Sequence, residues 1–118
     1  MTGIIDAGKT GGQAYAPIDE HGRYRVRFLF DTTPAGTRPV SCPVRMLQNH
    51  VGENYGTHFP LRAGAEVLVG FVNGDLDRPV IVGAVPNPLK PSPVTAREPV
   101  AHRIRTASGI TFEIVDEP

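Results

Sequence analysis

Three oxygen-bearing side chains alternate in a short segment between two apolar runs in the second half of the chain. Asn73, Asp75 and Asp77 could offer oxygen ligands to Ca²⁺. A calcium loop of the EF-hand type also needs a glycine and a distal glutamate at fixed spacing, and neither is in place. The alternative is a hairpin turn, because Asn73-Gly74 tolerates positive φ and Pro79 can open the next strand. We therefore predict a structural turn made by Asn73, Gly74, Asp75, Asp77, Arg78 and Pro79.

Two histidines lie in the longest irregular stretch, residues 48–64. His50 and His58, with Glu53 and Asn54 between them, are a conceivable zinc set. No third strong ligand follows at a motif spacing, and histidine in a glycine-containing loop is commonly a plain polar residue. We therefore expect no metal site here, and the sequence indicates no cofactor.

Arginines alternate with apolar and aromatic residues over residues 23–30, which indicates a half-buried strand. The outward set is Arg23, Arg25 and Arg27, and the inward set is Tyr24, Val26, Phe28 and Phe30. An arginine stripe could track the phosphates of a single-stranded nucleic acid, but such binding also uses exposed aromatic side chains. The 12 basic residues equal the 12 acidic ones, so the net charge is zero. We expect a solvated or partner-facing strand and no nucleic-acid binding.

The single cysteine cannot form a disulfide within the chain. Cys42 shares the alternation of Val44 and Met46, so we expect it to be buried and chemically inert. The chain contains no nucleophile elbow, no phosphate-binding loop and no recognisable carboxylate pair. We therefore predict that the chain is not an enzyme.

Glycine and proline together supply 25 of the 118 residues and separate short runs rich in Val, Ile and Phe. This pattern predicts an all-β chain with many turns. The runs at 65–72 and 79–85 are almost continuously apolar, so we expect two central strands buried on both faces, with close backbone approach at Gly83. We assign residues 1–87 to a small OB-fold-like β-barrel, 88–100 to a proline-rich linker and 101–118 to a terminal hairpin.

The N-terminal residues show no basic segment followed by an apolar segment, so no secretory signal peptide is predicted. The apolar runs are too short to span a bilayer as helices. The expected site of synthesis is the cytoplasm.

Several segments resemble, in the same order, the VgrG family of type VI secretion spike proteins, in the OB-fold region shared with phage baseplate spikes. They are DEHGRYRVRFLFD, PVRMLQ, YGTHFPLRAGAEVLVGFVNGDLDRPVIVGAVPNP and HRIRTASGITFEIVDE. Gly74-Asp75 and Asp77-Arg78-Pro79 match the turn of that family. The segment from His102 to Ile114 resembles the first hairpin of a C-terminal β-helical needle.

This resemblance implies the structural, non-catalytic neck domain of a membrane-puncturing homotrimer. In such a spike a base domain of the same protein sits on an Hcp-like tail-tube protein, and an effector or tip protein can bind the needle. The resemblance also implies export by a contractile secretion apparatus, or a place in a phage virion. The chain has neither the base domain nor most of the needle, so it looks like a fragment of a spike. A phage baseplate or tail spike assembly protein remains an alternative, and a single-stranded nucleic-acid binder of the OB type is a further one.

The terminal hairpin carries large apolar side chains for which the chain offers no obvious cover. Ile104 lies opposite the face of Arg103 and Arg105, and a two-stranded hairpin alone is marginal in water. Three copies could bury these residues around an axis. We therefore predict trimer contacts at Ile104, Ile110, Phe112 and Ile114.

Overall fold

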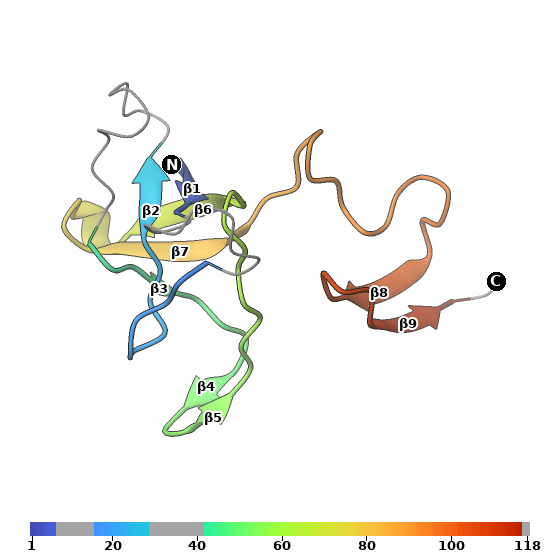
Figure 1. Cartoon of the computed structure of the whole chain (residues 1–118), viewed down its shortest axis with the longest axis horizontal. Coiled ribbons are helices and arrows are strands. Elements are labelled where there is room, and N and C mark those ends of the chain that lie inside the picture. The colour runs from blue at the N-terminus through green and yellow to red at the C-terminus, as the bar shows by residue number, and fades with distance from the viewer. Residues whose placement is uncertain (7–15, 29–41, 117–118) are drawn as a thin grey trace. The chain divides into compact units, whose positions relative to one another are not determined.

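The computed structural model of the chain describes residues 1–6, 16–28 and 42–116 (Figure 1). The chain divides into two compact units, Met1–Val85 and Pro86–Pro118, and each is described by itself. The described elements are nine strands and one short 3₁₀ helix. The all-β prediction is therefore confirmed. Phe30, which was expected to point inward, lies outside the described residues.

A five-stranded sheet forms the first unit, in the order β2-β1-β6-β7-β3. Neighbouring strands are antiparallel except β3 and β7, which are parallel. Their bounds are β1 Thr2–Ile5, β2 Val26–Phe28, β3 Arg45–Met46, β6 Glu66–Phe71 and β7 Pro79–Ala84. Within the described residues, β2 begins only at Val26 of the alternating segment that starts at Arg23, and β3 contains only Arg45 and Met46.

One isolated bridge joins the two edges of this sheet. Tyr24, just before β2, pairs with Val44, just before β3. The Tyr24 N–H donates to the Val44 carbonyl at 2.8 Å, and the Val44 N–H donates to the Tyr24 carbonyl at 2.6 Å. Over the described residues β2 and β3 form no ladder beyond this bridge, so these strands do not make a closed barrel.

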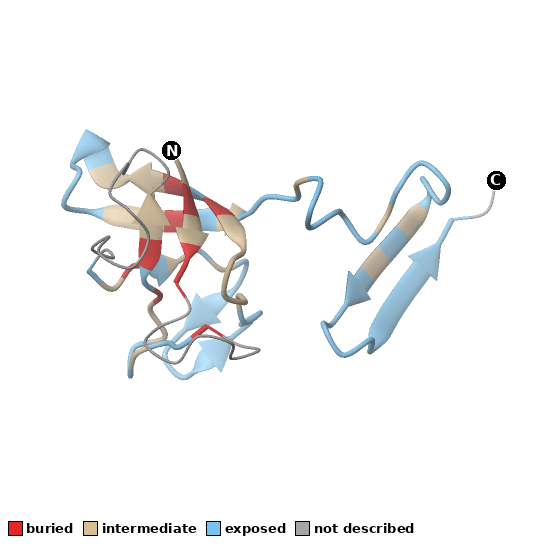
Figure 2. Ribbon diagram, turned by 45° about the horizontal axis from the view of Figure 1, so that its top comes forward, coloured by how far each residue is buried: buried red, intermediate tan, exposed pale blue. Residues whose placement is uncertain are grey.

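The core of the first unit lies on one face of the sheet (Figure 2). Its buried apolar residues are Ile5, Ala16, Tyr24, Val26, Val44, Val67, Val69 and Ile81. The Tyr24 hydroxyl accepts a hydrogen bond from the Leu61 N–H at 2.9 Å, so the one polar atom of this side chain is satisfied. The alternation in residues 23–28 therefore predicted the inward face correctly for Tyr24 and Val26.

Strands β6 and β7 occupy inner positions of the sheet, as expected, but they are not buried on both faces. Val69 and Ile81 pair across the two strands and are fully buried. On the opposite face Leu68 is 42% exposed and Val82 is 46% exposed. The expectation of burial on both sides is wrong because no second layer of described residues covers the outer face.

The two glycines nearest the sheet centre have different surroundings. Gly83 lies opposite Leu68 beside a bulge, and a Cβ atom there would meet nothing within 4 Å. The predicted close approach at Gly83 is therefore wrong. At Gly3 of β1, a Cβ would lie 2.5 Å from Cγ1 of Val26 and 3.1 Å from the Arg27 carbonyl oxygen. Of these two glycines, Gly3 is therefore the one whose neighbours leave no room for a side chain.

Cys42 is exposed, which contradicts the prediction that it is buried. It lies in a bend, and Pro43 separates it from the bridge at Val44. Because proline cannot donate to a ladder, strand pairing starts only after it. The alternation of apolar residues therefore includes Cys42, although Cys42 is not paired in the sheet.

A two-stranded arm extends from the first unit between β3 and β6 (Figure 1). Its strands are β4, Val51–Gly52, and β5, Tyr55–Gly56. The 3₁₀ helix η1, Val72–Gly74, lies between β6 and β7.

The second unit contains the hairpin of β8, Ala101–Arg105, and β9, Thr111–Val115. We call residues 86–99 the strap. The strap forms no strand, and a tight turn within it joins Asn87 and Lys90 through two backbone hydrogen bonds of 3.1 and 3.0 Å. Among the described residues of the whole chain, no helix is long and apolar enough to cross a membrane.

We predict that Gly3→Ala lowers the free energy of unfolding by about 1–3 kcal/mol, because the new methyl group must displace Val26 and the β2 backbone. Gly83→Ala is the matched control, since its methyl group enters open space. Urea denaturation of both variants measures the difference. Equal midpoints for the two variants would contradict the assignment of the close approach to Gly3.

We predict that the Cys42 thiol reacts with a colorimetric disulfide reagent in the native protein at a rate close to that in the urea-unfolded chain, because the residue is exposed. The measurement is the labelling time course with and without urea. Labelling that requires unfolding would show that Cys42 is protected in solution.

Candidate functional site

The acidic segment between β6 and β7 folds back on itself through backbone hydrogen bonds. The Val72 N–H donates to the Arg78 carbonyl at 3.0 Å and closes the turn. The Asp75 side chain accepts from the Asp77 N–H at 2.9 Å and lies 3.5 Å from the Arg78 guanidinium. Asn73 (φ 52°) and Gly74 (φ 73°) both adopt the left-handed conformation. Asp75 therefore bonds within the turn, and Pro79 starts β7 directly after it.

The two loop histidines contact different aromatic rings. His58 stacks on Tyr24 with ring centroids 6.5 Å apart, whereas His50 contacts Tyr55 at 5.5 Å. Within the described residues, no group of three or more His, Cys, Asp or Glu side chains could hold a metal ion. Each of these histidines thus lies against an aromatic ring, stacked for His58 and tilted for His50.

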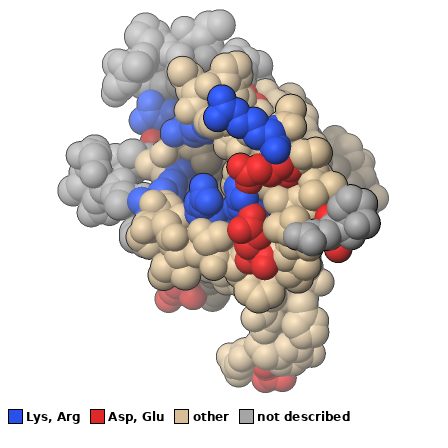
Figure 3. All heavy atoms as spheres, turned by 90° about the vertical axis from the view of Figure 1, so that its right-hand side faces the viewer, with Lys and Arg blue, Asp and Glu red and all other residues tan. Residues whose placement is uncertain are grey.

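Two of the three arginines in the expected stripe pair with carboxylates. Arg23 Nε lies 2.7 Å from Asp19, and Arg27 Nε lies 2.9 Å from the buried Asp6. The Arg23 N–H is the main cause that holds the pKa of the Asp19 carboxyl below its usual 3.8. The pairings of Arg23 and Arg27 reduce the charge that these two side chains could offer to phosphates. Acidic groups also lie directly beside basic ones on the face drawn in Figure 3, which is seen from the right-hand side of Figure 1.

The hairpin of the second unit has two unlike faces. Its cross-strand pairs are Ile104 with Phe112 and His102 with Ile114 on one face, and Arg103 with Glu113 and Ala101 with Val115 on the other. All four predicted trimer contacts, Ile104, Ile110, Phe112 and Ile114, are exposed within the chain. The register therefore collects Ile104, Phe112 and Ile114 on one bare apolar face.

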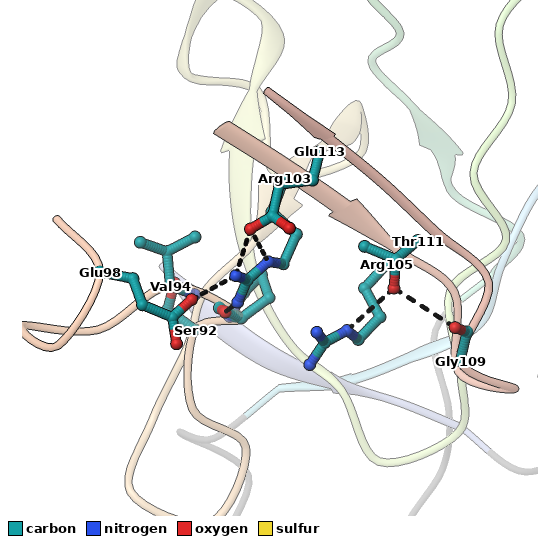
Figure 4. A network of polar contacts seen from close by, with 9 residues as sticks. Ser92, Val94, Glu98, Arg103, Arg105, Gly109, Thr111 and Glu113 are labelled. Atoms are coloured by element: carbon teal, nitrogen blue, oxygen red, sulfur yellow. Dashed lines mark hydrogen bonds and ion pairs between the residues drawn. The ribbon is translucent and has the colours of Figure 1, made fainter. Parts of the chain in front are cut away.

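The strap binds the opposite face of the hairpin through Arg103 (Figure 4). The guanidinium donates to the Pro93 carbonyl at 2.7 Å and also pairs with Glu98 of the strap and Glu113 of β9. Glu113 and Glu98 raise the pKa of Arg103 above its usual value. The Arg103 side chain is only 9% exposed. The strap thus covers the Arg103 side chain, but Val115 on the same face remains exposed, as do Ile104, Phe112 and Ile114 on the other face.

Sequence reasoning assigned no role to Arg103 beyond marking the polar face. The alternation of Arg103 with Ile104 was the feature of the sequence that indicated its position. In a strand this alternation places the arginine on the face opposite the apolar residues. The contact of Arg103 with Glu98 depends on the path of the strap. The spacing of residues in a proline-rich segment does not predict that path. Glu113 could have been found by pairing the two strands about the turn at residues 106–110.

Comparison with known proteins gives a consistent set of relatives. Residues 12–85 match the family described as the type VI secretion system/phage-baseplate injector OB domain. This chain is 41% identical to the type VI secretion system spike protein VgrG1a of Pseudomonas aeruginosa over 69 residues, or 58% of the chain. It is 40% identical over 64% of the chain to the spike protein VgrG3 of Vibrio cholerae. It is 39% identical over 75% of the chain to the actin cross-linking toxin VgrG1 of Vibrio cholerae.

The matched segment spans only 11%, 7% and 8% of these three relatives. The similarity concerns one region of much longer proteins. The family match nevertheless covers more than half of this chain and includes four strands of the five-stranded sheet, β2, β3, β6 and β7, while β1 lies before it. The chain therefore belongs to the type VI secretion system/phage-baseplate injector OB-domain family, in its VgrG neck region.

Proposed function

We propose that this chain is the non-catalytic neck of a homotrimeric, membrane-puncturing type VI secretion spike, with its C-terminal hairpin as the start of the needle. The observation that carries the proposal is the exposed apolar face of Ile104, Phe112 and Ile114, opposite the face that the strap contacts through Arg103. This face has three large exposed apolar side chains and the other has one, Val115, so the face of Phe112 offers the larger apolar surface to a second copy. Two of the three relatives, VgrG1a and VgrG3, are named spike proteins, which agrees with a structural role, whereas the third is named an actin cross-linking toxin.

The trimer contacts in this proposal are Ile104, Ile110, Phe112 and Ile114. Large apolar side chains that leave water on association contribute on the order of 1 kcal/mol or more each. Three copies of the face, arranged around an axis, would repeat that contribution in every subunit.

The turn from Asn73 to Pro79 has a different role: it fixes the register of β6 and β7, and a slip of one residue would turn Val69 and Ile81 outward.

The wider assembly follows from the same proposal. A base domain of the same protein would connect the neck to an Hcp-like tail-tube protein, and an effector or tip protein would bind beyond the needle. The spike would leave the cell through the contractile apparatus. A phage baseplate role is the second candidate, because the family description names both systems.

Phe112→Ser is predicted to weaken self-association of the full chain by about tenfold or more in the midpoint concentration, because it removes the largest apolar side chain of the bare face. Val115→Ser is the matched control. Phe112 is 63% exposed and Val115 is 51% exposed, but Val115 shares the face of Arg103. Sedimentation equilibrium over a concentration series measures the association.

Equal association of the two variants would contradict the assignment of the interface to the face of Phe112. A truncated chain that ends at Pro99 provides the second measurement. If the full chain trimerises and the truncated chain does not, residues 101–115 hold the trimer. If both trimerise equally, the interface lies in the first unit. If both stay monomeric at millimolar concentration, the hairpin does not suffice, and the proposed role of residues 101–115 is wrong for this chain.

A further inference from the structure

A hollow of about 410 Å³ lies in the first unit at the base of the two-stranded arm. The turn at Gly22, strand β3 and the arm all contribute to its walls. Its lining includes Arg45, Met46, Val51, Tyr55 and His58. None of the lining residues is acidic. The hollow therefore combines one full positive charge, polar groups and the apolar side chains of Met46, Val51 and Tyr55.

Arg45 differs from the other arginines of the first unit that the structure describes. Arg23, Arg27 and Arg78 each have a carboxylate partner. Arg25 and Arg62 also have interaction partners. Among the described residues nothing pairs with Arg45, whose side chain projects from β3 at the wall of the hollow. Its five N–H donors are consequently available to a carboxylate from another molecule.

The lining residue His58 contacts the core of the first unit. His58 stacks on the buried ring of Tyr24, and the Tyr24 hydroxyl accepts from the Leu61 N–H three residues further on. At the base of the arm the Thr57 N–H donates to the His50 carbonyl at 2.7 Å. Gly56 lies so close to this carbonyl that a Cβ would be 2.3 Å from its oxygen. The wall is thus formed before any ligand binds.

The arm offers apolar surface and unpaired backbone beside this charge. Val51 and Tyr55 are exposed. Strands β4 and β5 pair only with each other in the described part of the chain, so each keeps an outer edge. An extended polypeptide can add to such an edge by main-chain hydrogen bonds while its side chains enter neighbouring pockets.

We propose that this hollow binds an extended acidic segment of a partner protein, with one of its carboxylates paired to Arg45 and an adjacent apolar side chain against Val51 and Tyr55. Charge complementarity selects this occupant, because the lining contains no acidic residue and a guanidinium, Arg45, that pairs with none of the residues that the structure describes. The lining residues of the hollow belong to the first unit, whereas the proposed trimer contacts belong to the second. The peptide-binding proposal can therefore be tested separately from the trimer proposal.

The test uses the full chain and two blocked peptides that differ only in charge, acetyl-Val-Glu-Val-Glu-Val-amide and acetyl-Val-Gln-Val-Gln-Val-amide. We expect the acidic peptide to bind about tenfold more tightly, as a charge-assisted hydrogen bond implies. In ¹⁵N-edited spectra its addition should shift the amides of Arg45, Val51 and Tyr55. The difference between the peptides should shrink as salt is added.

Arg45→Gln should remove the preference for the acidic peptide without unfolding the chain, since Arg45 is exposed and unpaired. Arg25→Gln is the matched control, because Arg25 is also exposed but does not line the hollow. Equal affinity for both peptides would overturn the proposal, as would a preference that survives Arg45→Gln, or amide shifts confined to residues outside the lining. Thermal melting of both variants checks that they remain folded.

Discussion

Tyr24 is the residue at which three separate segments of the first unit meet. Its backbone bridges Val44 and so joins the two edges of the sheet, its hydroxyl accepts from the Leu61 N–H, and its ring stacks on His58. A tyrosine can do this because its ring is apolar enough for the core while its hydroxyl still needs a partner. The position of the segment from His58 to Leu61, and with it the wall of the hollow beside Arg45, therefore depends on this one side chain.

The second unit is organised by a different kind of interaction. Arg103 connects the strap to the hairpin through the Pro93 carbonyl, Glu98 and Glu113. A proline-rich strap has few N–H donors of its own, so a side chain that donates to its carbonyl oxygens is an effective way to hold it. Because Arg103 alternates with Ile104, this contact also fixes which face of the hairpin remains bare.

Charge pairing distinguishes the arginines of the first unit from one another. Arg23 and Arg27 belong to a turn and a strand that each bring a carboxylate nearby, so the alternating stripe seen in the sequence is largely neutralised within the fold. Arg45 comes from a two-residue strand beside the arm, where no acidic residue lines the hollow. The same residue type thus has an internal structural role in one place and an outward-facing charge in another.

The sequence by itself determined the all-β class, the inward phase of Tyr24 and Val26, and the central strands β6 and β7, because alternation and turn residues are local signals. Resemblance in the motifs around the Asn73–Pro79 turn supplied the family. Only the tertiary structure decided that Cys42 is exposed beyond Pro43, that Gly3 and not Gly83 lies against a neighbouring strand, and that β6 and β7 are bare on one face. Each of these three features depends on which segments pack against one another. Neither the alternation of residues in a strand nor the composition of a loop predicts this packing.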